Sequence, residues 1–161
     1  MKINLTTKKL TALSIVAAIY VVLTVMLGEL SYSNIQFRIS EALILLCFYK
    51  KEYIYALSVG CLIANIFSAM PIDVIFGTLA TVIAAFLVYK SKNIYIASVF
   101  PVIVNAIIVG AELNLFYGLP LFLSMAQVAM GEFVCVCILG VILFKSIEKN
   151  KAFIRIIRFE K

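Results

Sequence analysis

Long apolar runs, interrupted by single charged residues or short charged clusters, make up most of the chain. A helix needs roughly 20 apolar residues to cross the hydrocarbon core of a bilayer. The uncharged runs cover residues 10–28, 42–49, 53–72, 74–89, 93–111, 113–131 and 133–144. By length and composition, the first, third, fourth and fifth runs each predict one membrane-spanning helix.

The run at 113–131 contains two strong loop signals, Gly118 and Pro120. It therefore does not predict one continuous span. A helix is expected to begin near Leu121, to continue through the charged Glu132, and to end at about Phe144.

The run at 42–49 is too short to span a bilayer alone. Extended back to about Asn34, it takes in Arg38 and Glu41 and predicts a short, charged second helix. The pattern as a whole therefore predicts six transmembrane helices with short connections.

Composition supports this prediction and argues against an ordinary soluble domain. Of the 161 residues, 65% are hydrophobic and 14% are charged, and the mean hydropathy is +1.13. Soluble domains are about 45–50% apolar and about 25% charged. Six spans would use roughly 120 residues, which leaves no room for a folded extramembrane domain. We therefore expect an all-α integral membrane protein with a transmembrane domain at residues 1–144 and a tail at 145–161.

The placement of the basic residues predicts the orientation of the chain. With six spans both termini lie on one side of the membrane, and that side receives 13 of the 14 basic residues. Only Arg38 lies on the other side. Because positive loops remain in the cytoplasm, both termini are predicted to be cytoplasmic and the protein is expected in the cell membrane. The formal charge of +6 is explained by this topology, so nucleic acid is not expected as a partner.

The tail after residue 144 has the pattern of a short amphipathic helix. It carries basic residues on one face and apolar residues on another: Lys151, Arg155 and Arg158 against Phe153, Ile154 and Ile157. Such a helix is expected to lie on the cytoplasmic leaflet and to act as an anchor.

Several kinds of catalytic and metal site are excluded by the residues that the sequence lacks. The chain has no histidine, which excludes histidine-dependent zinc sites, Ser-His-Asp triads and Cys-His dyads. No P-loop motif is present. Two of the four cysteines, Cys135 and Cys137, would point about 200° apart on a helix. We expect no catalytic residue, no metal site and no cofactor bound by this chain, so transport would take its energy from an ion gradient or a partner.

Ionisable residues within predicted spans are candidates for function, because they are costly in the membrane unless they face a partner or a cavity. Glu132 is the strongest candidate, since it lies near the middle of the sixth predicted helix in an apolar setting. The alternative is a carboxyl group that bonds to a neighbouring helix. Arg38 and Glu41 are three residues apart on one helical face. They form either an intrahelical ion pair or part of a cavity open to the outside.

Four further candidates lie in the outer half of the predicted bundle. Asn65 belongs to a stripe of small and polar residues on the third helix, and its amide needs both donors and acceptors. Asp73 follows Pro71 and would either bind ligand or cap the fourth helix. Asn105 and Glu112 are seven residues apart on one face of the fifth helix. An outer half rich in carboxyl and amide groups suits a cation or a small polar ligand with many N–H donors, and not an anion.

The first predicted helix carries a stripe of small residues: Thr11, Ser14, Ala17 and Ala18. Small residues let another helix approach closely in a membrane. The stripe would either pack within the chain or form a docking face for another membrane subunit.

Several segments together resemble one family. They are residues 36–43 (Gln-Phe-Arg-Ile-Ser-Glu-Ala-Leu), 65–68 (Asn-Ile-Phe-Ser), 71–81 (Pro-Ile-Asp-Val-Ile-Phe-Gly-Thr-Leu-Ala-Thr), Asn105 with 110–112 (Gly-Ala-Glu), and 131–132 (Gly-Glu). In this order they are similar to the QueT family, the queuosine-precursor substrate-binding (S) components of energy-coupling-factor (ECF) transporters. The resemblance runs from the first predicted helix to the sixth and leaves out only the tail.

The resemblance implies an ECF S-component-like bundle of six helices with both termini in the cytoplasm. It implies a substrate site on the outer side, formed by the fourth to sixth helices and the outer loops. It also implies partners, namely a transmembrane coupling (T) subunit and two ATPase subunits that use the ATP. An S component of this kind docks through an Ala-x-x-x-Ala motif in its first helix. The corresponding residues here are Ser14 and Ala18, with serine in place of the first alanine.

The ligand implied by the resemblance is a 7-deazaguanine base with a 7-cyano or 7-aminomethyl group. We hypothesise that Glu132 or Glu41 binds the N–H edge of the base, that Asn65 and Asn105 bind its remaining polar atoms, and that Asp73 or Glu112 binds the amine. One alternative is a self-sufficient carrier of a small polar or cationic solute, driven by an ion gradient with Glu132 as its proton site. A carboxylate-based intramembrane enzyme is the weakest alternative, because no spacing of carboxylates demands catalysis.

Overall fold

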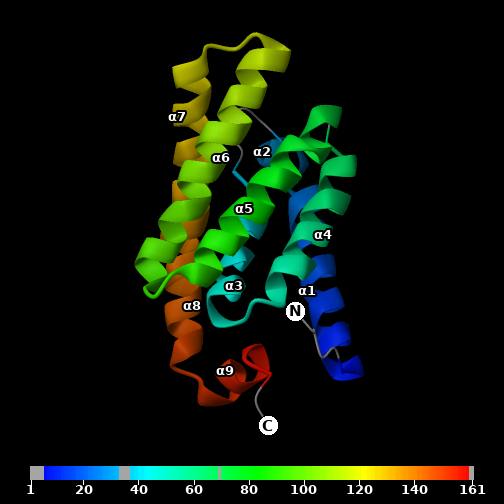
Figure 1. Ribbon diagram of the computed structural model, residues 1–161, viewed down its shortest axis with the longest axis vertical. Helices are drawn as coiled ribbons and strands as arrows, with labels where there is room; N and C mark the ends of the chain where they lie inside the picture. Colours follow the sequence, from blue (N-terminus) through cyan, green and yellow to red (C-terminus); the bar gives the residue numbers. More distant parts are fainter. Residues whose placement is uncertain (1–5, 33–36, 69, 160–161) are drawn as a thin grey trace.

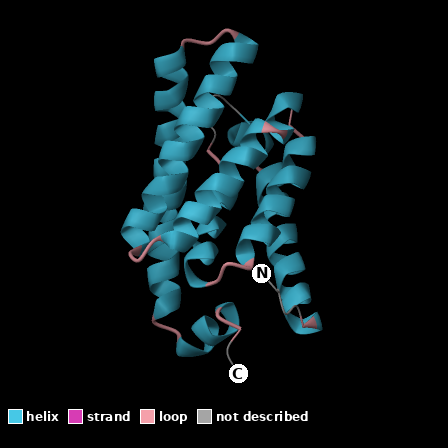
Figure 2. Cartoon of the chain, viewed as in Figure 1, coloured by secondary structure: helices cyan, strands magenta, loops and turns pink. Residues whose placement is uncertain are grey.

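The computed structural model describes residues 6–32, 37–68 and 70–159, and every regular element in these parts is helical. The elements in chain order are α1 (Thr7–Met26), α2 (Gly28–Tyr32), the 3-10 helix η1 (Ile39–Leu45), α3 (Leu46–Tyr49), α4 (Tyr53–Ile66), the 3-10 helix η2 (Pro71–Val74), α5 (Phe76–Lys90), α6 (Ile94–Tyr117), α7 (Leu121–Glu132), the π-helix η3 (Phe133–Gly140), α8 (Val141–Glu148) and α9 (Lys151–Ile157). Short loops join them (Figure 2).

The long helices pack side by side in one bundle (Figure 1). α1 packs against α4, α4 against α5, α5 against α6, and α6 against α7. η1 enters the bundle and contacts α1, α5, α6 and η3. The inserted 3-10 segment therefore meets elements from both halves of the chain.

Four helical segments in the described parts of the chain are long and apolar enough to cross a membrane. They are Thr7–Met26, Pro71–Lys90, Ile94–Tyr117 and Leu121–Glu148. Two shorter apolar segments, Ile39–Tyr49 and Tyr53–Ile66, complete the bundle. Large apolar side chains such as Val22, Phe86 and Ile103 are exposed on its outside, as expected where lipid surrounds the helices. This all-helical architecture is that of a membrane helical bundle, while the number of six spans remains a prediction.

The second predicted helix differs from a regular α-helix. It begins as the 3-10 helix η1 and becomes α-helical only at α3. A 3-10 helix rises about 2.0 Å per residue, compared with about 1.5 Å for an α-helix, so this short segment reaches further than its length suggests. Two residues used in the sequence-based predictions, Asn34 and Gln36, lie outside the described residues.

Three other predicted boundaries also shift. α4 ends at Ile66 rather than Ile72, and the 3-10 turn that begins at Pro71 separates it from α5. α6 continues through Glu112 to Tyr117, where Gly118 with φ of 69° ends it in the left-handed conformation. The last long segment runs to Glu148, past the predicted end near residue 144. The buried Glu112 therefore does not end α6.

The two ends of the bundle differ in character. In Figure 1 the loop between α6 and α7 lies at one end, with the junction of α4 and α5 towards the same side. α9 lies at the opposite end, below the loops that precede α4 and α6. Those two loops carry the lysines at positions 50, 51 and 92, and Lys90 is the last residue of α5. The structure thus collects the basic loops towards the end at which the tail lies, and the cytoplasmic orientation of that end remains a prediction.

α1 and α4 approach each other closely at a glycine. A Cβ atom added at Gly60 would lie 3.1 Å from the backbone oxygen of Ala17 and 3.2 Å from the Cβ of Tyr20. Such contacts are tighter than ordinary van der Waals packing, so only glycine fits this crossing without displacement of the helices. This is the small-residue packing that is common between membrane helices.

We expect Gly60→Val to lower the free energy of unfolding by about 1–3 kcal/mol, because the larger side chain pushes α1 and α4 apart. Thermal unfolding of the purified protein in detergent measures this change. Ala18→Val is the matched control, since Ala18 is exposed on α1. Equal stability of the two variants would contradict the close α1–α4 crossing.

The predicted topology is testable with single cysteines in a background without the four native cysteines. Tyr117→Cys is expected to react with a membrane-impermeant maleimide in intact cells. Lys51→Cys and Lys92→Cys are expected to react only after the membrane is permeabilised, because the six-span topology places both in the cytoplasm. Labelling of Lys51→Cys from outside, with Lys92→Cys protected, would reject the six-span topology.

Candidate ligand-binding site

All seven residues that the sequence analysis placed in a ligand site are buried in the bundle, none more than 3% exposed. They come from the segment that begins η1, from α4, η2 and α6, and from the end of α7: Arg38, Glu41, Asn65, Asp73, Asn105, Glu112 and Glu132. We refer to these seven residues as the polar cluster. Seven polar side chains buried in an apolar bundle need hydrogen-bond or charged partners, and the structure provides some of these partners.

Arg38 interacts with most of the other residues of the polar cluster. Its Nη1 atom lies 3.9 Å from the Oε1 atom of Glu41, and its Nη2 atom donates to the Oδ1 atom of Asn65 at 3.2 Å. The guanidinium also interacts electrostatically with Asp73, Glu112 and Glu132. The predicted ion pair between Arg38 and Glu41 is therefore present, and it is part of a network that crosses from η1 to α4, η2, α6 and α7.

One oxygen of Glu41 accepts hydrogen bonds from two elements. The Tyr20 hydroxyl donates to Oε1 from α1, and the Thr81 hydroxyl donates to it from α5 at 3.2 Å. A further hydrogen bond of 2.6 Å joins Thr24 to Ser40, next to Glu41 in the chain. The sequence analysis missed Tyr20, although a tyrosine within an otherwise apolar span is a signal of a buried polar contact.

Asn65 is fixed by hydrogen bonds through both ends of its amide. Its Oδ1 atom accepts from Arg38, and its Nδ2 atom donates to the backbone oxygen of Asp73 at 2.9 Å. A Cβ atom at Gly77 would lie 2.9 Å from the Asn65 Nδ2 atom, so glycine leaves the space that this amide occupies. Asn65 thus connects the end of α4 to the turn that precedes α5.

The carboxyl group of Asp73 does not cap α5. Neither η2 nor α5 has a side-chain capping hydrogen bond at its N-terminus. The Asp73 carboxyl instead accepts from the Ser68 hydroxyl at 2.7 Å and interacts with the carboxyl of Glu112 on α6. The capping alternative is therefore wrong, and Asp73 belongs to the polar cluster.

Asn105 and Glu132 bring α6 and α7 into the same cluster. The Asn105 side chain interacts with the Glu132 carboxyl, and Glu132 also interacts electrostatically with Glu41. Glu132 directly precedes the π-helix η3. Such π-helical segments are frequent at functional sites, where they change the direction of side chains along a helix.

Several buried atoms of the cluster lack a hydrogen-bond partner among the described residues. Five are carboxyl oxygens: Oε2 of Glu41, Oδ1 of Asp73, both oxygens of Glu112, and Oε2 of Glu132. The amide nitrogen Nδ2 of Asn105, a donor, also lacks a partner. A buried polar group without a partner costs about 1–3 kcal/mol. The site is therefore rich in acceptors and suits a ligand that brings several N–H donors or a positive charge.

The expectation of a cavity open to the outside is not met in this structure. The seven side chains are enclosed by the helices around them. A ligand from outside therefore reaches these atoms only when part of the surrounding structure moves. Four residues of the cluster lie at the short turns η1 and η2 or near the end of α4, namely Arg38, Glu41, Asn65 and Asp73. These parts separate more easily than the middle of long helices, where Asn105 and Glu132 lie.

The predicted docking stripe on α1 is divided between two environments. Thr11, Ser14 and Ala18 are exposed, whereas Ala17 is partly buried at the crossing with α4. Ser14 and Ala17 also line an apolar groove of about 410 Å³ between α1 and α4, together with Leu10, Leu13, Tyr55, Ala56 and Val59. Of the four residues of the stripe, packing within the chain therefore explains the small side chain of Ala17 only.

The acidic residues of the cluster do not form a metal centre. Within the described parts of the chain, no group of three or more His, Cys, Asp or Glu residues has the geometry to hold a metal ion. All four cysteines are free thiols. The described chemistry of the site is that of hydrogen bonds and charge.

Comparison with known proteins shows similarity over most of the chain. The family model described as "QueT transporter" matches residues 10–149. A curated relative, "Queuosine precursor transporter QueT" from Lactococcus lactis subsp. cremoris (strain MG1363), is 44% identical over 79 residues. That match covers 48% of this chain and 47% of the relative, so the similarity spans about half of each protein. No solved structure matches the chain. Because the family model covers most of its length, the chain belongs to the QueT transporter family.

Proposed function

We propose that this chain is the membrane-embedded substrate-binding subunit of an ECF-type ABC importer. In this proposal it captures a queuosine precursor, a 7-deazaguanine base such as the 7-cyano or 7-aminomethyl compound, from outside the cell. ATP-driven partner subunits then complete the transport. Membership of the QueT transporter family and the name of the Lactococcus relative support the class of substrate.

The observation that carries the proposal is the excess of acceptors in the polar cluster. Five buried carboxyl oxygens lack a donor among the described residues, whereas one amide nitrogen lacks an acceptor. The edge of a guanine-type base presents a ring N–H and an exocyclic amine, which two carboxyl oxygens accept, and a carbonyl oxygen, which takes one donor. The base therefore complements the site in the type of hydrogen bonds that it makes.

The contacts within the cluster suggest a role for each group. Glu132 and Glu41 each have one oxygen to offer to the N–H edge of the base, and the Asn105 amide has a donor for its carbonyl oxygen. Glu112 has two oxygens for the cationic aminomethyl group, with Asp73 beside it. Asn65 is already bonded at both ends of its amide, so it positions Arg38 and Asp73 in this proposal.

The partners in this proposal are a T subunit and two ATPase subunits. The chain has no P-loop, so it does not hydrolyse ATP by the mechanism of these ATPases. The groove between α1 and α4, with Ser14 exposed beside it, offers a surface on which a membrane helix of the T subunit would pack. An ion-gradient-driven carrier with Glu132 as proton site is the alternative that the uptake experiment below tests.

Glu132→Gln is expected to weaken binding of the preferred base about tenfold or more, because it replaces an acceptor of the N–H edge by an amide. Isothermal titration of the purified protein with the cyano base, the aminomethyl base and queuine measures the change and identifies the preferred ligand. Glu148→Gln is the matched control, since Glu148 lies at the far end of the same long segment and pairs with Lys145. Unchanged affinity in a folded Glu132→Gln protein would remove Glu132 from the site.

Uptake of labelled base distinguishes the two transport mechanisms. We expect cells that produce this chain alone to bind the base without accumulating it. Accumulation is expected when the T and ATPase subunits are present, and it should depend on ATP. Accumulation by the chain alone, abolished by a protonophore, would instead establish the ion-gradient carrier.

A further inference from the structure

Two of the three buried residues of α1 carry hydroxyl groups, although the helix as a whole is apolar. These two are Tyr20 and Thr24, and the third buried residue is Leu13. Tyr20 and Thr24 are four residues apart, so their side chains lie on the same face of the helix, one turn apart. Both hydroxyl groups form hydrogen bonds with side chains of η1. α1 therefore contacts the segment that carries Glu41 through two polar groups.

The two contacts act on adjacent residues of η1. The Tyr20 hydroxyl donates to the Oε1 atom of Glu41, and a hydrogen bond of 2.6 Å joins the hydroxyl groups of Thr24 and Ser40. The Thr24 hydroxyl also donates to the backbone oxygen of Tyr20 at 2.8 Å. All four side chains are fully buried. Hydrogen bonds are electrostatically stronger in such an environment than in water, so these contacts restrain η1 against α1.

The carboxyl group of Glu41 is held through one of its two oxygens. Its Oε1 atom accepts from Tyr20 and, at 3.2 Å, from Thr81. The same oxygen lies 3.9 Å from the Nη1 atom of Arg38. The Oε2 atom is buried and has no hydrogen-bond partner among the described residues. Because the carboxyl group is rigid and planar, the donors that hold Oε1 restrict the direction in which Oε2 points.

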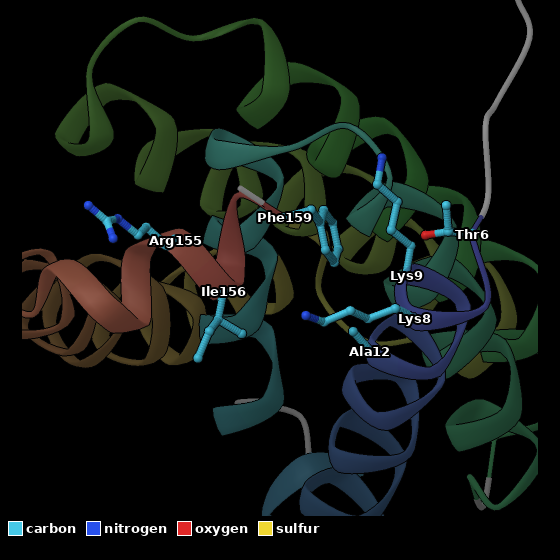
Figure 3. Close-up of a pocket in the computed structure, with 7 residues that line it drawn as sticks. All are labelled: Thr6, Lys8, Lys9, Ala12, Arg155, Ile156 and Phe159. Carbon is cyan, nitrogen blue, oxygen red and sulfur yellow. The ribbon is translucent and has the colours of Figure 1, made fainter. Parts of the chain in front are cut away.

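α1 itself has a defined position in the bundle. Near its start, the Lys9 ammonium lies 3.5 Å from the Oε1 atom of Glu52 and 5.5 Å from the centre of the Phe159 ring. Figure 3 shows this end of α1, with Lys9 beside Phe159 of the tail. Further along, α1 crosses α4 closely at Gly60. Tyr20 therefore reaches Glu41 from a helix that is fixed on both sides of the crossing.

We propose that Tyr20 is a positioning residue for substrate binding, an inference that rests on the proposed function. Its hydroxyl holds Oε1 of Glu41, so that Oε2 faces the N–H edge of the base. Thr24 supports this arrangement, because its contact with Ser40 fixes the neighbouring residue of η1. An acceptor that is already oriented binds more tightly, since less conformational freedom is lost when the ligand binds.

Isothermal titration of the purified full chain in detergent tests this proposal, with the 7-cyano and 7-aminomethyl bases as probes. Tyr20→Phe keeps the aromatic ring and removes only the hydroxyl, and it is expected to weaken binding of the preferred base about tenfold. Tyr20→4-aminophenylalanine places an N–H donor on the same ring. We expect it to restore the affinity to within about threefold of that of the unaltered protein.

Tyr53→Phe is the matched control. Tyr53 is also buried, and its hydroxyl donates to the backbone oxygen of Ile157 at 3.0 Å. It lies at the start of α4, whereas Asn65 of the polar cluster lies near the end of that helix. Each tyrosine variant loses one buried hydrogen bond, so both are expected to lower the midpoint of thermal unfolding. Only Tyr20→Phe is expected to change the dissociation constant of the base.

A second variant decides the question if Tyr20→Phe does not fold. Thr24→Val keeps the shape of the side chain and removes the hydroxyl that contacts Ser40. Because its effect on Glu41 passes through the neighbouring residue, we expect it to weaken binding about threefold. An unchanged dissociation constant in this variant would then contradict the positioning of Glu41 by α1.

Three results would overturn the inference alone. One is equal affinity of Tyr20→Phe and the unaltered protein for the base. Another is an equal loss of affinity in Tyr53→Phe, which would show a general effect of stability on binding. The third is a failure of Tyr20→4-aminophenylalanine to regain affinity, which would show that the donor is not what matters. Binding of neither base by the unaltered protein would instead overturn the proposed function, and this inference with it.

Discussion

The guanidinium of Arg38 is surrounded by carboxyl groups that belong to four different elements. It lies 3.9 Å from Glu41 in η1 and interacts with Asp73 in η2, Glu112 in α6 and Glu132 in α7. Charged groups are costly inside an apolar bundle, and a cation that lost these partners would be costlier still. The network therefore favours one arrangement of the two halves of the chain. Because one cation faces four carboxyl groups, the network also leaves an excess of hydrogen-bond acceptors, which a donor-rich ligand would complete.

Much of this site was predictable from the sequence, because a charge within an apolar run must find a partner wherever the chain folds. That argument alone singled out Glu132 and Glu112, and the structure brings both into one cluster. The contacts from Tyr20 and Thr81 to Glu41 were not predictable in the same way. They join residues 21 and 40 positions apart, and a local pattern carries no information about such pairings.

The type of each helix and the enclosure of the polar cluster also could not be predicted from the pattern of apolar and polar residues. An apolar run predicts that a segment is helical, but the same run accommodates the 3-10 turns of η1 and the π-helical turns of η3. Polar residues near helix ends suggested an open cavity, whereas the packing of η1 and η2 between the long helices encloses them. The enclosure follows from tertiary contacts, and it implies that binding and release of a ligand require movement of these short segments.

A structure of the chain with the 7-aminomethyl base bound would test the central claim most directly. The account predicts that the N–H edge of the base lies within hydrogen-bond distance, about 2.7–3.2 Å, of Glu132 and Glu41. It also predicts that the amine contacts Glu112. A base bound elsewhere, for example in the groove between α1 and α4, with the four carboxyl groups still packed around Arg38, would contradict it.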